Sequence, residues 1–223
     1  MAIAASDVKA LRDVTGAGMM DCKKALTECN GNMDAAIQWL RERGIAKAAK
    51  RAGKVAAEGA VASYIHMGGK IGVLVEVNCE TDFVARGDDF QTLVKDICLQ
   101  VCSASPQWVS RDEVPQGAID VEKSVYVAQA AETGKPEAIC VKIAEGKMKK
   151  WFTEVCLLDQ VSVKPEHDGK SIGDLITELS GKCGEKIEVR RFVRFQLGEG
   201  IDKPVSNLAE EVAAELAKSE GKG

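Results

Sequence analysis

The residues able to do covalent or metal chemistry in this chain are eight cysteines and two histidines. No two cysteines are spaced Cys-x-x-Cys, and a chain of 223 residues does not need disulfides to hold its core. His66 and His167 lie in no motif that ties them to a cysteine, so an activated thiol is not indicated. Phosphate-loop, nucleophile-elbow and zinc-protease motifs are missing. The sequence favours binding over catalysis and predicts no metal or cofactor site; a thiol enzyme is the catalytic alternative.

One polar corner suits a contact with another protein. Alternation predicts a strand over Ile71–Asn78 with its odd-numbered residues on one face, and a helix is expected to begin near residues 87–88. The corner between them should face solvent and consists of Thr81, Asp82, Phe83 and Val84. A phenylalanine beside a carboxylate suits a protruding wedge; the alternative is that Phe83 folds back beneath the helix.

Three apolar repeats separated by glycine turns predict an N-terminal bundle of short helices over residues 1–44, of the ubiquitin-associated type. The third helix is expected to end at Gly44. The expected buried residues are Ala4, Val8 and Leu11, then Met19, Cys22, Ala25, Leu26 and Cys29, then Met33, Ala36, Ile37 and Leu40. Met20 lies beside the second stripe, and either offers a flexible thioether to a partner or caps the bundle's own core.

A basic helical linker is expected over residues 45–58. The segment Arg41–Lys54 carries six basic residues against one acidic residue, although the whole chain has a net charge of −4. Contact with RNA, the ribosome or an acidic surface is one interpretation, and a solvated helix is the other. The solvated helix is favoured, since no aromatic side chain is interleaved after Trp39 and the chain as a whole is acidic.

Residues 59–200 predict an α+β core, an antiparallel sheet with flanking helices. Val61–Met67 and the strand from Ile71 should form a hairpin with a two-residue loop, Gly68-Gly69. A long helix should follow the corner and bury Phe90, Leu93, Val94, Ile97, Cys98, Val101 and Cys102.

The second half of this core predicts more helices and two more strands. Helices should bury Val121, Val125 and Ala128, then Ile139, Cys140 and Ile143, with Gly146 separating the latter from residues 148–155. A strand is expected over Leu157–Val163, a helix capped by Ser171, and a central strand over Lys186–Leu197. An amphipathic helix, residues 204–218, and a loose tail should complete the last segment, residues 201–223.

The strand Lys186–Leu197 carries three arginines around Phe192. Such a patch either stacks a nucleobase or lies under another subunit. No apolar run approaches the roughly 18 residues of a membrane span, and the N-terminus lacks a secretory pattern, so a cytoplasmic protein is expected, with no membrane contact.

Several stretches together resemble bacterial elongation factor Ts, the family of nucleotide exchange factors for elongation factor Tu. The most specific are Thr15-Gly-Ala-Gly-Met-Met20 and Thr81-Asp-Phe-Val84. The similarity continues through Lys142–Lys147, Leu157–Gln160 and Arg190–Gly200, in order over nearly the whole chain. The run Gln160–Pro165 departs from the pattern of many members.

The resemblance implies two contacts with elongation factor Tu. The N-terminal bundle would dock on the GTPase domain through Arg12, Met19, Met20 and Lys23. The corner Thr81–Val84 would dislodge the partner's magnesium, with Phe83 inserting between helices of the GTPase and Asp82 disturbing the region of the ion and the phosphate loop. The magnesium belongs to the partner, and no direct contact with nucleic acid is expected.

The resemblance also implies an oligomeric state. The chain is similar to short members of the family, which hold one core unit and work as homodimers. A two-plus-two complex with elongation factor Tu is therefore expected, with Phe192 and its strand at the subunit interface. The competing interpretation is an RNA- or ribosome-binding module that uses residues 41–54.

Overall fold

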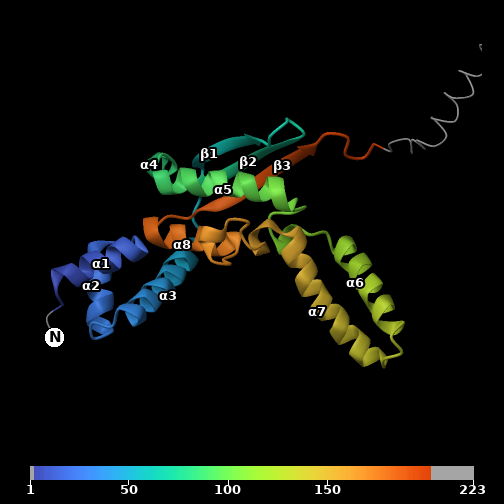
Figure 1. The fold of residues 1–223 in the computed structure, drawn as a ribbon, viewed down its shortest axis with the longest axis horizontal. Helices are drawn as coiled ribbons and strands as arrows, with labels where there is room; N and C mark the ends of the chain where they lie inside the picture. The colour runs from blue at the N-terminus through green and yellow to red at the C-terminus, as the bar shows by residue number, and fades with distance from the viewer. Residues whose placement is uncertain (1–2, 202–223) are drawn as a thin grey trace, which may run out of the picture.

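The computed structural model describes residues 3–201 and has the expected α+β fold, with three N-terminal helices ahead of an antiparallel sheet and its flanking helices (Figure 1). The helices are α1 (Ala5–Thr15), α2 (Met19–Glu28), α3 (Met33–Arg51), α4 (Asp82–Ala85), α5 (Asp88–Ala104), α6 (Gln116–Ala131), α7 (Glu137–Val155) and α8 (Ile172–Cys183). The strands are β1 (Glu58–Ile65), β2 (Ile71–Cys79) and β3 (Glu188–Gln196). Short 3-10 turns lie at Arg111–Glu113, Leu157–Asp159 and Pro165–His167.

The N-terminal bundle buries the predicted stripes, with two exceptions. Its centre consists of Val8, Leu11, Cys22, Ala25, Leu26 and Ala36. Ala4 is exposed, because it is the N-cap of α1 and precedes the first turn. Met19 is exposed for a similar reason, since it is the first residue of α2. The bundle core is therefore small, and its α1–α2 corner is open to solvent.

Helix α3 does not end at Gly44 as the sequence predicted, but continues to Arg51. Gly44 faces Gly181 of α8, and a Cβ built on Gly181 would lie 2.8 Å from the Gly44 Cα. The two glycines thus allow the backbones of α3 and α8 to approach closely. This glycine is a helix-crossing position, and the first part of the expected linker extends the third helix of the bundle.

The sheet has the order β1-β2-β3, with both neighbouring pairs antiparallel. β2 is therefore the central strand, and the prediction that β3 would be central is wrong. The β1–β2 loop is also longer than predicted: the amide of His66 donates to the carbonyl of Ile71, so four residues from Met67 to Lys70 form the loop. Gly68 and Gly69 supply its left-handed conformations, with φ values of 81° and 68°.

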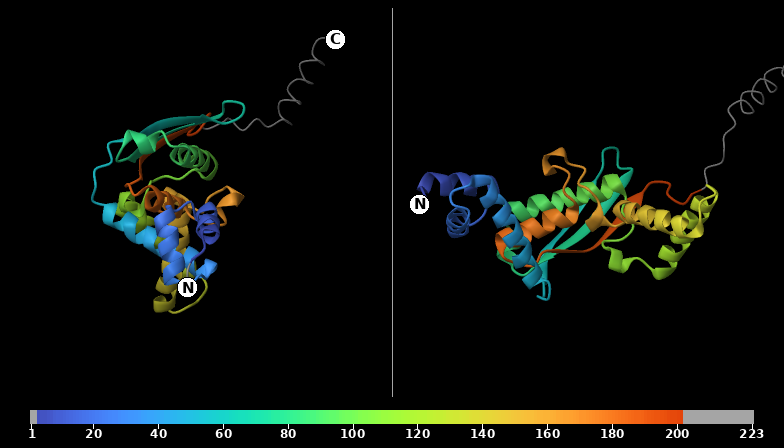
Figure 2. Two further views of the ribbon diagram at one scale, coloured as in Figure 1. Left: turned by 90° about the vertical axis from the view of Figure 1, so that its left-hand side faces the viewer. Right: turned by 90° about the horizontal axis from the view of Figure 1, so that it is seen from below.

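Helix α5 covers one face of the sheet, and all seven residues of its predicted apolar stripe are buried. They pack on Val73, Val75 and Val77 of β2 and, with Ile172 and Ile176 of α8, make up most of the main core. Within residues 3–201, the helices lie on this side of the sheet (Figure 2). The opposite face has no cover among residues 3–201, and its exposed apolar residues are Val61, Ile65, Leu74, Val193 and Phe195.

Helices α6 and α7 form a hairpin that projects away from the sheet (Figure 1). The predicted inward stripe is wrong in part: Val121, Val125 and Ile139 are 63, 42 and 46 % exposed. Two helices without a third element bury little, so Ala130 is the only buried residue of α6. Helix α7 also runs unbroken through Gly146, which the sequence predicted to be a break.

The segment Leu157–Val163 forms a 3-10 turn and irregular backbone instead of the predicted strand. Two buried glutamines hold it in place. Gln100 of α5 donates to the Gln160 side chain at 3.1 Å and accepts from the amide of Val163 at 2.8 Å. Side chains satisfy backbone groups here that a sheet partner would otherwise satisfy.

The predicted helix over residues 204–218 lies outside the described residues. Within residues 3–201, none of the helices combines the length and apolar character needed to cross a bilayer.

We predict that Gly181→Ala lowers the free energy of unfolding. The new methyl group would meet the backbone of Gly44, an overpacking that typically costs about 1–3 kcal/mol, against about 1 kcal/mol of improved helix propensity. Gly146→Ala in α7 is the matched control, because nothing lies within 4 Å of its added Cβ. Urea titration of both variants tests this; equal stabilisation by both would contradict the close crossing of α3 and α8.

Candidate functional site: an exposed corner and the face of the N-terminal bundle

The corner after β2 is a one-turn helix, α4, with Phe83 on its outer side. Phe83 is 85 % exposed, so the alternative that it folds beneath the next helix is wrong. Ala85 is buried and Val84 packs on the main core. Since successive helical residues are about 100° apart, turning these two inward directs Asp82 and Phe83 outward.

Four residues that sequence reasoning missed hold the root of this corner. The Glu185 carboxylate accepts hydrogen bonds from the Thr81 amide at 3.0 Å and from the Thr81 hydroxyl at 2.7 Å. The Glu80 carboxylate accepts from the Lys186 amide at 2.7 Å and from the Arg51 guanidinium at 3.1 Å. The partners lie on α3 and on the α8–β3 turn, and no local pattern in the sequence signals these contacts.

The acidic group of the corner forms a local ion pair. Asp82 and Arg86, one helical turn apart, approach to 2.7 Å, and their side chains are 60 and 80 % exposed. A pair this exposed contributes little to stability. The Asp82 carboxylate is therefore available to a positively charged partner group at low cost.

The four bundle residues assigned by the resemblance are all exposed at the α1–α2 corner. Met20 is 76 % exposed, so it does not cap the bundle's core, and Met19 is 52 % exposed. Lys23 follows them by three and four residues and so shares their side of α2. Arg12 lies in the last turn of α1. Within residues 3–201, neither Arg12 nor Lys23 has an ion-pair partner, which leaves an apolar surface flanked by free cations.

The two exposed sites lie at the same end of the molecule, opposite the α6–α7 hairpin (Figure 1). Helix α3 joins them, since it begins in the bundle and its last residue, Arg51, reaches Glu80. A partner that covers one site is thus placed beside the other.

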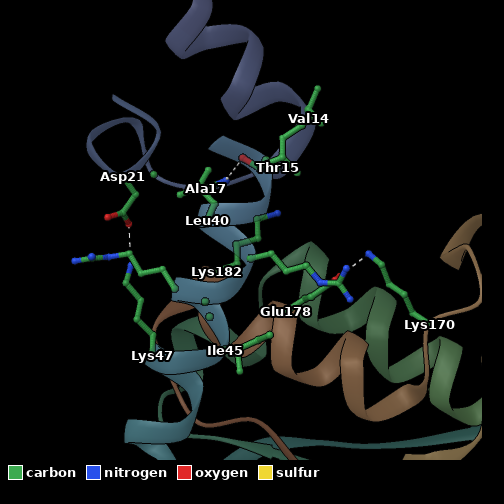
Figure 3. A pocket seen from close by; sticks show the side chains of 16 residues that line it. Val14, Thr15, Ala17, Asp21, Leu40, Ile45, Lys47, Lys170, Glu178 and Lys182 are labelled. Atoms are coloured by element: carbon green, nitrogen blue, oxygen red, sulfur yellow. Dashed lines mark hydrogen bonds and ion pairs between the residues drawn. The ribbon is translucent and has the colours of Figure 1, made fainter. Parts of the chain in front are cut away.

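A cleft of about 330 Å³ separates the bundle from α8 (Figure 3). Four of its charged side chains form ion pairs with one another: Lys47 with Asp21 at 2.8 Å and Lys170 with Glu178 at 2.8 Å. The lining contains neither histidine nor cysteine. The cleft lies between the bundle and α8, and both of its carboxylates, Asp21 and Glu178, are held in ion pairs.

Part of the basic segment Arg41–Lys54 interacts with other residues of the same chain. Lys47 pairs with Asp21, Arg51 pairs with Glu80, and Arg43 lies over the Trp39 ring at 4.9 Å. Three of its six basic residues thus have internal partners. This distribution supports a structural helix over a nucleic-acid surface.

Three of the buried cysteines are poor nucleophiles. Burial raises the pKa of Cys79, Cys98 and Cys156 to about 11, so these thiols stay protonated at neutral pH. In the part of the chain that the structure describes, no cluster of three or more cysteine, histidine or acidic residues has the arrangement of a metal site.

Comparison with known proteins identifies the family. A family model described as elongation factor TS matches residues 3–199. The chain belongs to the elongation factor Ts family. It is 55 % identical over 214 residues to elongation factor Ts of Geobacter sulfurreducens, covering 96 % of this chain and 98 % of the relative. It is 58 % identical over 211 residues to that of Anaeromyxobacter dehalogenans strain 2CP-1, with 95 % of each chain covered.

A relative named elongation factor Ts from Alkaliphilus metalliredigens is 54 % identical and is covered over its full length. Elongation factor Ts is the nucleotide exchange factor for elongation factor Tu in translation elongation, and it is not an enzyme. The family expected from the Thr-Gly-Ala-Gly-Met-Met and Thr-Asp-Phe-Val motifs is confirmed.

We predict that Phe83→Ala changes the free energy of unfolding by no more than about 0.5 kcal/mol, since an exposed side chain contributes little to the core. Phe90→Ala in α5, where the ring is 1 % exposed, should cost about 3–5 kcal/mol. Thermal or urea unfolding of the two variants measures the contrast. A large loss of stability from Phe83→Ala would show that the ring packs within its own chain.

Proposed function

We propose that this protein releases GDP from elongation factor Tu through two contacts made by one end of the molecule. Arg12, Met19, Met20 and Lys23 dock the bundle on the GTPase domain. Phe83 then inserts between helices of that domain while Asp82 disturbs the region that holds the magnesium and the phosphates. The observation that carries the proposal is the 85 % exposure of Phe83 on a corner fixed by hydrogen bonds at its root.

The physical basis is linkage between two ligands of the same GTPase. A GDP complex held by backbone amides, a lysine and a metal loses affinity when one of these is displaced. The coupling is reciprocal, so nucleotide must expel the factor as strongly as the factor expels nucleotide. Exchange therefore needs a factor that binds the nucleotide-free GTPase better than the loaded one.

The binding free energy of the wedge alone is small, so the proposed exchange needs the docking contact as well. Burying a phenylalanine contributes on the order of 1.5–3 kcal/mol, and about 1.4 kcal/mol corresponds to a tenfold change in affinity. A wedge alone would therefore change GDP affinity only about ten- to a hundredfold. The docking face supplies the remaining binding energy and places the wedge beside the phosphates.

We predict that Phe83→Ala sharply slows release of labelled GDP from elongation factor Tu at saturating factor, because the inserted ring is lost. Met20→Ala should instead raise the factor concentration needed for half-maximal release, because it weakens docking. Val121→Ala is the control, since it shortens an exposed apolar side chain on α6, at the other end of the molecule. Unchanged release by Phe83→Ala would overturn the wedge.

We also infer that the protein works as a homodimer and forms a two-plus-two complex. The support is the uncovered apolar face of the sheet, whose cross-strand neighbours include Leu74 with Val193 and Gly72 with Phe195. Contiguous exposed apolar surfaces typically mark interaction sites, and two copies of one face can pair about a twofold axis. Phe192, expected at the interface, instead packs on the covered side against the core.

We predict that Phe195→Glu yields a monomer where the unmodified protein sediments at twice 23.9 kDa, because a charge would be buried between the paired sheets. Val121→Glu, which places the same charge on exposed α6, should leave the dimer intact. Sedimentation velocity measures both. A Phe195→Glu protein of unchanged mass would place the interface elsewhere.

A further inference from the structure

We propose that Glu185 and Glu80 are positioning residues for nucleotide exchange: their carboxylates fix the orientation of α4, and with it Phe83, relative to the docking bundle. The inference rests on the proposed wedge function and identifies the residues of this chain that orient the wedge. It concerns residues that touch neither Phe83 nor, by hypothesis, the nucleotide site.

Glu185 orients the cap of α4. Thr81 is the N-cap, and its hydroxyl oxygen accepts from the Val84 amide at 3.4 Å. The same hydroxyl donates to one Glu185 oxygen, while the Thr81 amide donates to the other. Because the hydroxyl proton points to Glu185, its lone pair is directed at the helix. The carboxylate thereby sets the start and direction of a helix of only four residues, which is too short to hold its own geometry.

Glu185 is itself held at the end of α8. Gly184 adopts a left-handed conformation with φ 76° and its amide donates to the carbonyl of Ser180 at 2.9 Å. The buried Ser180 hydroxyl in turn donates to the carbonyl of Glu185. The carboxylate is therefore presented by a closed helix end, and α8 rests on α3 through the Gly44–Gly181 crossing.

Glu80 makes the second connection. One of its oxygens accepts from the Lys186 amide at 2.7 Å and the other pairs with Arg51 at 3.1 Å, and its side chain is 17 % exposed. Arg51 is the last residue of α3, whose first turns belong to the bundle. A helix of 19 residues spans about 28 Å as a stiff element. The docking face and the wedge are thus joined by one helix and one ion pair.

We expect these contacts to affect the orientation of Phe83 more than the folding stability of the protein. Thr81 is exposed and Glu185 is half-buried, so each hydrogen bond contributes modestly to folding. An effector that must enter a partner at one place is sensitive to small displacements, as reacting groups are. Loss of the carboxylate should therefore appear in the maximal rate of GDP release before it appears in thermal stability.

The test measures GDP release from elongation factor Tu over a range of factor concentrations, to separate the maximal rate from the half-saturating concentration. Glu185→Ala and Thr81→Ala should each lower the maximal rate about tenfold, with the half-saturating concentration changed less than about twofold. The double variant should lose less than the two single losses combined, because both single variants remove the hydrogen bond between the Thr81 hydroxyl and the Glu185 carboxylate. Thr81→Ser, which keeps the hydroxyl, should restore the rate.

Two matched controls separate the loss of a contact at the corner from the mere loss of a charge. Glu178→Ala removes an acid from α8 that pairs with Lys170, away from the corner, and should leave the rate unchanged. Arg51→Ala should lower the maximal rate, whereas Lys50→Ala, which removes the same charge from an exposed position without the Glu80 contact, should not.

Phe83→Ala in the same assay tests the wedge role of Phe83 separately from the positioning role of Glu185. If GDP release is slow with Phe83→Ala but fast with Glu185→Ala, the positioning role is overturned and the wedge role stands. Additive losses in the Glu185→Ala, Thr81→Ala double variant would likewise overturn it. A fast Phe83→Ala would overturn the wedge and the positioning role together.

Discussion

Two hydrogen bonds between the Glu185 carboxylate and Thr81 hold the corner at the end of β2 that presents an exposed aromatic ring. A four-residue helix has no stability of its own, and a free phenylalanine would fold onto the nearest apolar surface. Here the backbone is fixed at Thr81, while the side chains of Val84 and Ala85 face the core. Phe83 is therefore left on the outer side of the turn. The exposed ring follows from the way its neighbours are held.

The sheet and α3 provide the frame for that contact. Helix α5 covers one face of the sheet, so β2 has a buried side that anchors the corner and an open side that is free for a second subunit. Helix α3 leaves the bundle and crosses α8 at two glycines before Arg51 reaches Glu80. The proposed wedge and docking face are thus held by contacts between residues that are far apart in the sequence and meet at one end of the fold.

Periodicity predicted the elements with a buried stripe, such as α5 and β2, because burial imposes the pattern. It failed where another constraint took over. Gly44 resembles a helix end but permits a helix crossing, and Gly146 faces solvent in an unbroken helix. The exposed Phe83 and Met20 were identified by motif, but the Glu185–Thr81 contact joins residues 104 positions apart and leaves no local signal.

In the proposed mechanism, the ring of Phe83 enters the GTPase domain of elongation factor Tu. A photoreactive benzophenone amino acid placed at position 83 measures this most directly, when the nucleotide-free complex is irradiated and the cross-linked peptides are sequenced. We expect a cross-link to helices of the GTPase domain beside the magnesium and phosphate region, and we expect it to be lost when excess GDP is added. A cross-link to another domain, or none in a complex that still exchanges nucleotide, would contradict it.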